Sequence, residues 1–287
     1  MQTKWWTPYL FVSLAMLGLF VFRFAPIGAA LWGSLQETSL TGEVRFAGLE
    51  NYTYLFSDPT FWNSIRVTLL FNLVINPLQV VCAMVLALML VRPGPFLGVF
   101  RASFMAPMTV SIALTAVIWG ILLEPTLGPV NGFLKWLGVP PQPFFRSADQ
   151  AIWSIIGIAT WKGAGYWMIF LLAGLIAIPR DVLEAAEIDG AGWWSRLVFI
   201  ILPLMKRPLA FVLVADTAIN FLMFAPPYII TQGGPAGTTH LLMFEAYQSA
   251  FTYFDHGRAM AISVIVLAMI LLIVGLELRL LRPKGAH

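Results

Sequence analysis

Residues 180–207 read RDVLEAAEIDGAGWWSRLVFIILPLMKR and lie between two long apolar runs. The stretch is dense in charge, whereas only 11% of the whole chain is charged. A charged segment between two apolar runs indicates a loop that leaves the membrane and faces water. Its acids and bases are Asp181, Glu184, Glu187, Asp189, Arg180, Arg196, Lys206 and Arg207.

The rest of the chain has the composition of a membrane protein. Of its 287 residues 59% are hydrophobic, and an ordinary soluble domain is about 25% charged. Each apolar run meets the need for about 20 residues to cross the hydrocarbon core, and without period-2 alternation such runs are helices. The sequence predicts an all-α integral membrane protein with six transmembrane helices, at approximately 8–32, 62–91, 97–123, 151–178, 208–232 and 259–281.

Two regions follow from these runs. Residues 1–61 are expected to hold the first transmembrane helix and an outer loop, and residues 62–287 a five-helix core with the cytoplasmic loop 180–207. The first run is too long for the apolar part of a signal peptide, and no convincing cleavage site follows it, so we expect it to remain as a helix.

The basic residues predict the orientation, because cytoplasmic loops carry an excess of Lys and Arg. With a cytoplasmic N-terminus, the outer residues are Arg45, Lys135, Arg146 and Arg258. The inner residues are then Lys4, Arg92, Arg101, Arg180, Arg196, Lys206, Arg207, Arg279, Arg282 and Lys284. Both termini are therefore expected in the cytoplasm. The pI of 9.1 reflects this bias and does not indicate nucleic-acid binding.

The sequence lacks the residue patterns that a disulfide, a metal site, a nucleotide site or a catalytic site would require. Cys82 is the single cysteine, and the three histidines are scattered, so no disulfide or metal site is expected. The dipeptide Gly-Lys does not occur, so the chain has no phosphate-binding loop of the Walker type. No nucleophile and base stand in a catalytic pattern. We expect a chain that is not an enzyme and binds no cofactor itself.

The charged loop is predicted to form a short helix. Asp181 and Glu184, three apart after Pro179, suggest an N-terminal capping box. The helix should run to about Ile188 and stop at Gly190, where a left-handed residue is favoured. A second helical piece over 191–202 should be ended by Pro203.

One face of this short helix is small. Val182, Ala185 and Ala186 share it by helical spacing, so another surface could approach closely. The alternative is an amphipathic helix lying on the bilayer, but its acids would be unfavourable near anionic headgroups.

Four motifs, in this order, resemble one protein family. The loop carries E-A-A-x3-G-x9-I-x-L-P, and the other three stretches are Phe46-Ala-Gly-Leu-Glu-Asn-Tyr52, Leu172-Ala-Gly-Leu175 with Ile178-Pro179, and Thr231-Gln-Gly-Gly-Pro235. Together they resemble the permease family of carbohydrate-type ABC importers, in its maltose-permease-like branch. The chain departs from the family pattern at Leu197, usually Phe, and Ile201, usually Thr. The family's ATPase-coupling positions match Glu184, Ala185, Ala186, Asp189, Gly190, Ile200, Leu202 and Pro203.

The resemblance implies a complex in a bacterial or archaeal cytoplasmic membrane. Its other members would be a second, unlike permease subunit, two ATPase subunits that bind ATP and Mg, and an extracytoplasmic solute-binding protein. The solute would be a sugar or a sugar-like polyol, and ATP hydrolysis would drive its import.

Polar residues within the apolar runs are candidates for the solute pathway, because charges there are costly and usually functional. Asn72, Asn76 and Gln79 form a stripe at i, i+4, i+7, which interhelical hydrogen bonding also explains. Asp216 and Asn220 stand at i, i+4 in the fifth run. We expect Lys162 near enough to Asp216 to form an ion pair.

The resemblance adds further pathway positions. The sugar-contacting stretch of the maltose branch corresponds to Thr160, Trp161, Lys162 and Gly163, and Tyr166 follows in the same run. The same branch has sugar contacts just after the coupling loop, with the spacing of Asp216 and Asn220. Met223 replaces a further amide there, and a structural role for Lys162 is the alternative.

Three loops are expected outside, at 33–61, 124–150 and about 233–258. They form either an irregular outer surface or a docking face for the solute-binding protein. The rivals to an importer subunit are an ion- or proton-coupled secondary transporter, which would need inverted repeats, and a membrane-bound enzyme, for which no catalytic cluster is present.

Overall fold

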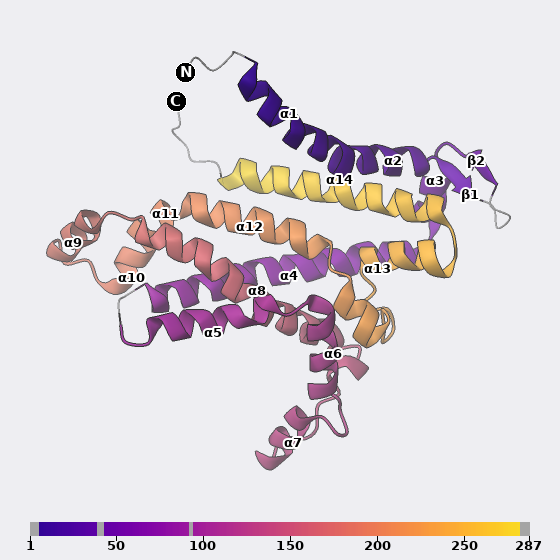
Figure 1. Ribbon diagram of the computed structural model, residues 1–287. Helices are drawn as coiled ribbons and strands as arrows, with labels where there is room; N and C mark the ends of the chain where they lie inside the picture. The colour runs from indigo at the N-terminus through magenta and orange to yellow at the C-terminus, as the bar shows by residue number, and fades with distance from the viewer. Residues whose placement is uncertain (1–5, 39–42, 92–93, 282–287) are drawn as a thin grey trace. The chain divides into compact units, whose positions relative to one another are not determined.

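The computed structural model describes residues 6–38, 43–91 and 94–281 (Figure 1). Of the basic residues expected inside, Lys4, Arg92, Arg282 and Lys284 lie outside the described residues. The described chain is mainly helical, with one antiparallel pair of strands, β1 (Gln36–Thr38) and β2 (Val44–Phe46), in which Glu37 faces Arg45.

Four stretches are long and apolar enough to cross a membrane. The first is Tyr9–Gly33, in which a π-helical turn, Phe20–Phe24, joins α1 (Thr7–Leu19) to α2 (Ala25–Gly33). The others are α4 (Pro59–Leu90), α8 (Ala151–Ile176) and α14 (His256–Leu281). The expectation of a mainly helical membrane protein is confirmed, and the six spans remain a prediction.

Two further apolar stretches are bent helix pairs, so the described chain has four spans, or up to six if each pair is one span. One pair is α5 (Leu97–Thr109) with α6 (Ile112–Leu122), bent by 98°. The other joins Trp193–Leu204, which comprises α10 (Trp193–Arg196), a π-helical turn (Leu197–Ile201) and α11 (Leu202–Leu204), to α12 (Lys206–Phe221), with a bend of 69°.

The prediction of one continuous helix over 97–123 is wrong. Val110 and Ser111 have extended backbones, and α6 begins anew after Ser111. The hydroxyl of Ser111 accepts the amide N–H of Leu114 at 3.2 Å. Serine is among the favoured N-terminal caps, because its side-chain oxygen satisfies an amide that has no helical partner. The apolar run therefore hid a helix boundary.

The prediction of one helix over 208–232 is also wrong. The helix α12 ends at Phe221, and a separate π-helical turn covers Pro227–Thr231. The break lies at residues 222–224, and Pro226 and Pro227 open the helical segment that follows it, with Pro226 at the N-cap of the π-helical turn. A proline in the first turn removes no bond that the helix needs, so this pair marks the start of a new segment rather than a continuation of α12.

The chain divides into two compact units, and each is described by itself. The first combines the N-terminal segment up to Trp62, including α3 (Glu50–Ser57), with Glu245–Ala268. Within it, Arg258 donates to Asp58 at 2.8 Å and to Glu245 at 2.6 Å. These three side chains are largely buried, and the paired charges offset the cost of burying each one alone. The remaining helical segments of this unit are the C-terminal part of α13 (Leu242–Tyr247) and a π-helical turn (Gln248–Thr252).

The second unit combines Asn63–Phe244 with the C-terminal segment from Met269. Its centre is α8, which packs against α5 and α12 (Figure 1). At Gly165 a side chain is excluded, because a Cβ would lie 1.8 Å from the carbonyl oxygen of Phe104 on α5. Beyond this bundle lie α7 (Pro129–Trp136), a short 3-10 helix (Phe144–Arg146) and α9 (Arg180–Ile188). The predicted regions 1–61 and 62–287 remain a prediction.

Candidate functional site

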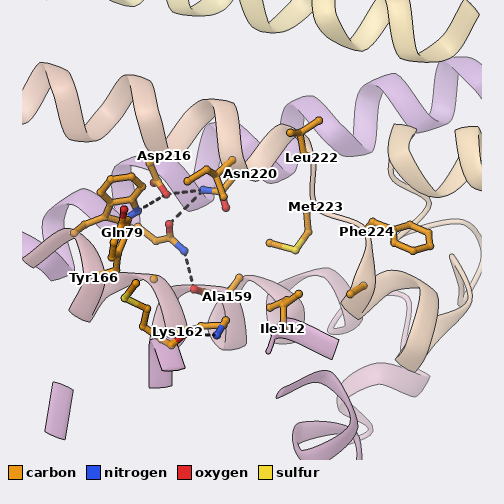
Figure 2. A pocket seen from close by; sticks show the side chains of 15 residues that line it. Gln79, Ile112, Ala159, Lys162, Tyr166, Asp216, Asn220, Leu222, Met223 and Phe224 are labelled. Atoms are coloured by element: carbon orange, nitrogen blue, oxygen red, sulfur yellow. Dashed lines mark hydrogen bonds between the residues drawn. The ribbon is translucent and has the colours of Figure 1, made fainter. Parts of the chain in front are cut away.

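A cavity of about 480 Å³ lies inside the second unit (Figure 2). Its walls come from α4, α5, α6, α8, α12 and the segment after α12. Most of the wall is apolar, and its polar side chains converge from three helices. These are Gln79, Lys162, Tyr166, Asp216 and Asn220.

Asp216 is the buried acid of the cavity, with 1% of its surface exposed. Its Oδ1 accepts the indole N–H of Trp167 at 2.6 Å and the amide of Asn220 at 3.0 Å (Figure 2). Its Oδ2 is buried and has no hydrogen-bond partner among the described residues. A carboxylate oxygen is an acceptor only, so the site keeps one unused acceptor beside the cavity.

Side-chain amides connect the helices around Asp216. Asn220 donates to Asn76 at 2.8 Å and to Gln79 at 3.3 Å, and Gln79 donates to the carbonyl of Ala159 at 2.8 Å. These bonds join α12, α4 and α8. Amides that bond one another across a bundle stabilise its packing, so the cavity wall is held by a network rather than by isolated contacts.

The same network continues away from the cavity. Asn76 donates to the hydroxyl of Thr217 at 2.9 Å, and Thr217 donates to Glu277 at 2.9 Å. Asn72 donates to the carbonyl of Thr68 at 2.9 Å. Neither Asn72 nor Asn76 lines the cavity, so the geometry favours interhelical hydrogen bonding for these two.

Lys162 is not paired with Asp216, so that expectation is wrong: the two form no ion pair in the described part of the chain. The ammonium instead donates to three backbone carbonyls, those of Pro107 at 3.0 Å, Met108 at 3.4 Å and Val110. The break between α5 and α6 leaves carbonyls at the end of α5 without helical partners, and a cation is favoured at this negative end. Since an ammonium has three donors, all three are occupied.

Lys162→Met should therefore loosen the break between α5 and α6. The change leaves the part-buried carbonyls of Pro107 and Val110 without this donor, and an unpaired buried carbonyl costs about 1–3 kcal/mol, so we expect a clearly lower midpoint of thermal unfolding in detergent. Lys162→Arg keeps the charge and donors and should recover part of the loss. Lys135→Met, at an exposed position of α7, is the control and should melt like the wild type. Equal midpoints for Lys162→Met and the control would contradict this role.

The other predicted pathway residues divide into two groups. Gly163 and Tyr166 line the cavity, whereas Thr160 and Trp161 do not. Thr160 is buried, and its hydroxyl has no hydrogen-bond partner among the described residues. Trp161 is half-exposed and meets Trp119 edge to face, with ring centroids 5.4 Å apart.

Trp167, Thr217 and Glu277 belong to the network and were missed by the sequence reasoning. Trp167 follows Tyr166, and nothing in the local pattern distinguishes its indole from an apolar packing group. Glu277 could have been found, because it is an acid within the last predicted apolar run, where charges are rare and usually functional.

The charged loop forms α9, whose end matches the prediction. Gly190 has a φ of +77°, the left-handed conformation that stops a helix. The amide of Ala191 donates to the carbonyl of Ala186 at 2.9 Å, and that of Gly190 to Glu187 at 3.1 Å. This bonding is a Schellman pattern, which satisfies the last carbonyls of the helix.

The beginning of α9 differs from the prediction. Pro179 occupies the N-cap position, Asp181 lies inside the first turn, and the cap has no side-chain hydrogen bond. The expected capping box is therefore wrong. The second helical piece runs over Trp193–Leu204 and ends one residue after Pro203, close to the predicted end.

The positions of the loop that were predicted to couple to an ATPase differ in exposure. Glu184, Ala185 and Asp189 are exposed, whereas Ala186 is only 8% exposed. We expected the small face to be fully exposed, but Ala186 is buried. Ile188, two residues further along, is 87% exposed. Further along, Ile200 and Leu202 are half-buried and Pro203 is exposed.

The family match and the curated relatives of this chain agree with each other. Residues 2–284 match the family described as "Binding-protein-dependent transport system inner membrane component". A curated relative from Agrobacterium fabrum (strain C58 / ATCC 33970), the sn-glycerol-3-phosphate transport system permease protein UgpA, is 30% identical over 96% of this chain and 95% of its own length. The trehalose/maltose transport system permease protein MalF of Thermococcus litoralis is 33% identical over 92% of this chain and 89% of its own length.

A solved structure has the same fold. A chain in the crystal structure of a bacterial alginate ABC transporter, in complex with an alginate pentasaccharide-bound periplasmic protein, superposes with a TM-score of 0.84. The match covers 96% of this chain and 94% of that chain at 20% identity.

Proposed function

Because the chain belongs to the family of binding-protein-dependent transport system inner membrane components, we propose that it is a permease subunit of an ATP-driven ABC importer for a sugar or sugar-like polyol. The trehalose/maltose and glycerol-phosphate systems of its relatives support this solute class. The match of residues 2–284 to this family argues against an ion- or proton-coupled secondary transporter.

The observation that carries the solute class is the polar part of the cavity wall. Asp216 keeps one free carboxylate oxygen, and Asn220, Gln79 and Tyr166 lie on the same wall. Sugar hydroxyls donate and accept hydrogen bonds, so a carboxylate beside amide groups suits them. Apolar residues such as Met223 and Phe224 fill most of the remaining wall and suit the apolar faces of a sugar ring.

Lys162 has a positioning role in this proposal. Its three donors are used on the carbonyls between Pro107 and Val110, so none is left for the solute. By fixing the break between α5 and α6, it holds Met108 and Ile112 on the cavity wall. The cavity therefore presents hydrogen-bond acceptors and amide groups to a solute, and the Lys162 ammonium is not available to it.

The loop around α9 is proposed to couple the membrane subunit to an ATPase. Glu184 and Ala185 are exposed on α9, and Gly190 ends the helix sharply, so a compact element is presented to a partner. ATP and Mg would be bound by two separate ATPase chains. A second, unlike permease subunit would complete the membrane part, with both termini of this chain in the cytoplasm.

The outer loops are proposed to dock the solute-binding protein. The helix α7 exposes Trp136 and Phe133, whose rings stack with centroids 5.8 Å apart. Asn131 braces this helix through the carbonyls of Pro125 and Gln142, at 3.1 and 2.9 Å. A rigid, partly aromatic outer surface is suited to protein docking.

Purification and reconstitution test the proposal. The tagged chain, expressed with its neighbouring genes, should co-purify with an ATPase and a second permease. In proteoliposomes, the binding protein should stimulate ATP hydrolysis, and labelled trehalose and sn-glycerol-3-phosphate would be compared as solutes. Uptake driven by an ion gradient without ATP, or purification without any ATPase, would overturn it.

A further inference from the structure

A second hollow, of about 900 Å³, is lined by residues from the ends of α4 and α8 and from α9 and α10. We call it the loop groove and define it by an apolar wall and a basic rim. The wall comes from the last turns of α4 and α8 and includes Val85, Leu88, Met89, Leu175 and Ile176. The rim holds Arg180 and Arg196.

The wall of the loop groove is apolar and open. Met89 is 68% exposed, Ile176 61% and Val85 49%, although all three lie in helices long and apolar enough to span a membrane. Exposed apolar side chains on a spanning helix are solvated by acyl chains. The wall therefore has the chemistry that a lipid tail requires.

The rim lies where the two spanning helices end, at Leu90 and Ile176. Arg180 is the first residue of α9 and is exposed, and it forms no ion pair in the described part of the chain. Arg196 binds Glu187 through Nη1 at 3.0 Å. A guanidinium carries five N–H donors in a fork that fits a phosphate, so both arginines keep donors for an anion.

Two neighbouring features favour the same occupant. The first amides of α9 have no side-chain cap, which adds partial positive charge near Arg180. Trp193 lines the groove and is 47% exposed, and tryptophan is enriched at the level of lipid headgroups. The acids Asp181 and Glu184 do not line the groove.

We propose that the loop groove binds an anionic phospholipid, with its phosphate at Arg180 and Arg196 and an acyl chain along α4 and α8. Basic pockets between spanning helices at a membrane surface are the known setting for anionic headgroups. The bound lipid would fill the space between the bundle and the loop, and would hold α10 against the ends of α4 and α8. This inference needs only that the chain spans a membrane, and not a particular solute.

Lipid retention tests it. The full transporter complex, purified from nanodiscs of phosphatidylcholine with one quarter phosphatidylglycerol, is stripped with detergent and weighed by native mass spectrometry. The wild type should retain phosphatidylglycerol in preference to phosphatidylcholine. At roughly 1 kcal/mol for each basic residue near the surface, the double variant Arg180→Gln with Arg196→Gln should weaken retention about thirtyfold.

Three variants separate the headgroup from the wall and from a general charge effect. Glu187→Gln frees Arg196 from its acid and should increase retention. Met89→Trp fills the wall but keeps both arginines, and should reduce retention. Arg279→Gln, at the end of α14, removes an exposed arginine elsewhere and should change nothing. Circular dichroism and gel filtration show that each variant is folded and assembled.

A competition experiment distinguishes a lipid headgroup from a free phosphate compound as the ligand. Glycerol phosphate, added at millimolar concentration, should not displace the lipid if the apolar wall contributes. Displacement by it would mean a site for free phosphate and would overturn the lipid assignment. So would equal retention of both lipids, unchanged retention in the double arginine variant, or cross-linking of Met89→Cys to a partner subunit in a variant that lacks Cys82.

Discussion

Gly190→Val should abolish solute uptake, whereas Gly190→Asn should leave most of it. The φ of Gly190 is +77°, and a Cβ there would meet no atom within 4 Å, so only backbone strain opposes a side chain. For most residues this conformation costs about 1–2 kcal/mol, and for a β-branched one it is a true outlier, whereas asparagine tolerates it. Valine should therefore distort the end of α9, which the Schellman bonds fix, and the coupling surface with it.

The measurement is ATP-dependent uptake in proteoliposomes, together with the amount of ATPase that co-purifies. We expect at least a tenfold loss of uptake for valine, and a loss below twofold for asparagine. Because Gly190 follows α9, which lies beyond the bundle around α8, the helical bundle should melt as the wild type does. Equal uptake in the two variants would show that the conformation at Gly190 is not needed for coupling.

Asp216→Leu should also abolish uptake, through the cavity rather than the loop. The change removes the acceptor of Trp167 and of Asn220, and takes the one free carboxylate oxygen from the cavity. Asn220 keeps Asn76 and Gln79 as acceptors, but the buried indole N–H of Trp167 is left unpaired, which costs about 1–3 kcal/mol. Because the acceptor for the solute is lost as well, we expect roughly a hundredfold slower uptake. Asp216→Asn keeps one oxygen acceptor and should be intermediate.

The controls distinguish transport from assembly. The yield of the assembled complex should fall by less than twofold for Asp216→Asn, and solute binding by the external protein should not change. Trp167→Phe removes only one donor to Asp216 and should slow uptake less than Asp216→Leu. Normal uptake in Asp216→Leu would refute a pathway role. Loss of uptake in proportion to assembly in both Asp216 variants would assign the residue to structure alone.

The sequence alone determined the features that depend on composition and on local backbone chemistry. A chain with 11% charged residues and long apolar runs can satisfy its backbone only within membrane helices, whatever else it contacts. The end of α9 was equally local, since Gly190 is the residue type that adopts a positive φ without strain. The loop motif, read with the three others, indicated the family that the full-length match then showed.

Only the tertiary structure decided where the polar side chains meet. Helical periodicity placed Asp216 and Asn220 on one face, but it does not fix the rotation of a helix against its neighbours. Lys162 and Asp216 were therefore expected to pair, because each was a charge in need of a partner. In the fold, Asp216 accepts from Trp167 on α8, and Lys162 reaches the carbonyl of Pro107, 55 residues away.

The breaks in two apolar runs were decided in the same way. At Val110 the carbonyl that the helix leaves free is taken by Lys162, a residue 52 positions distant. Within a membrane, non-helical backbone is tolerated only where such groups find a partner. A run of apolar residues indicates only that the segment lies in an apolar environment. It does not show which distant side chain is present to replace a backbone hydrogen bond. In the fold Lys162 supplies that bond at the break between α5 and α6, and residues on both sides of the break, Met108 and Ile112, line the cavity.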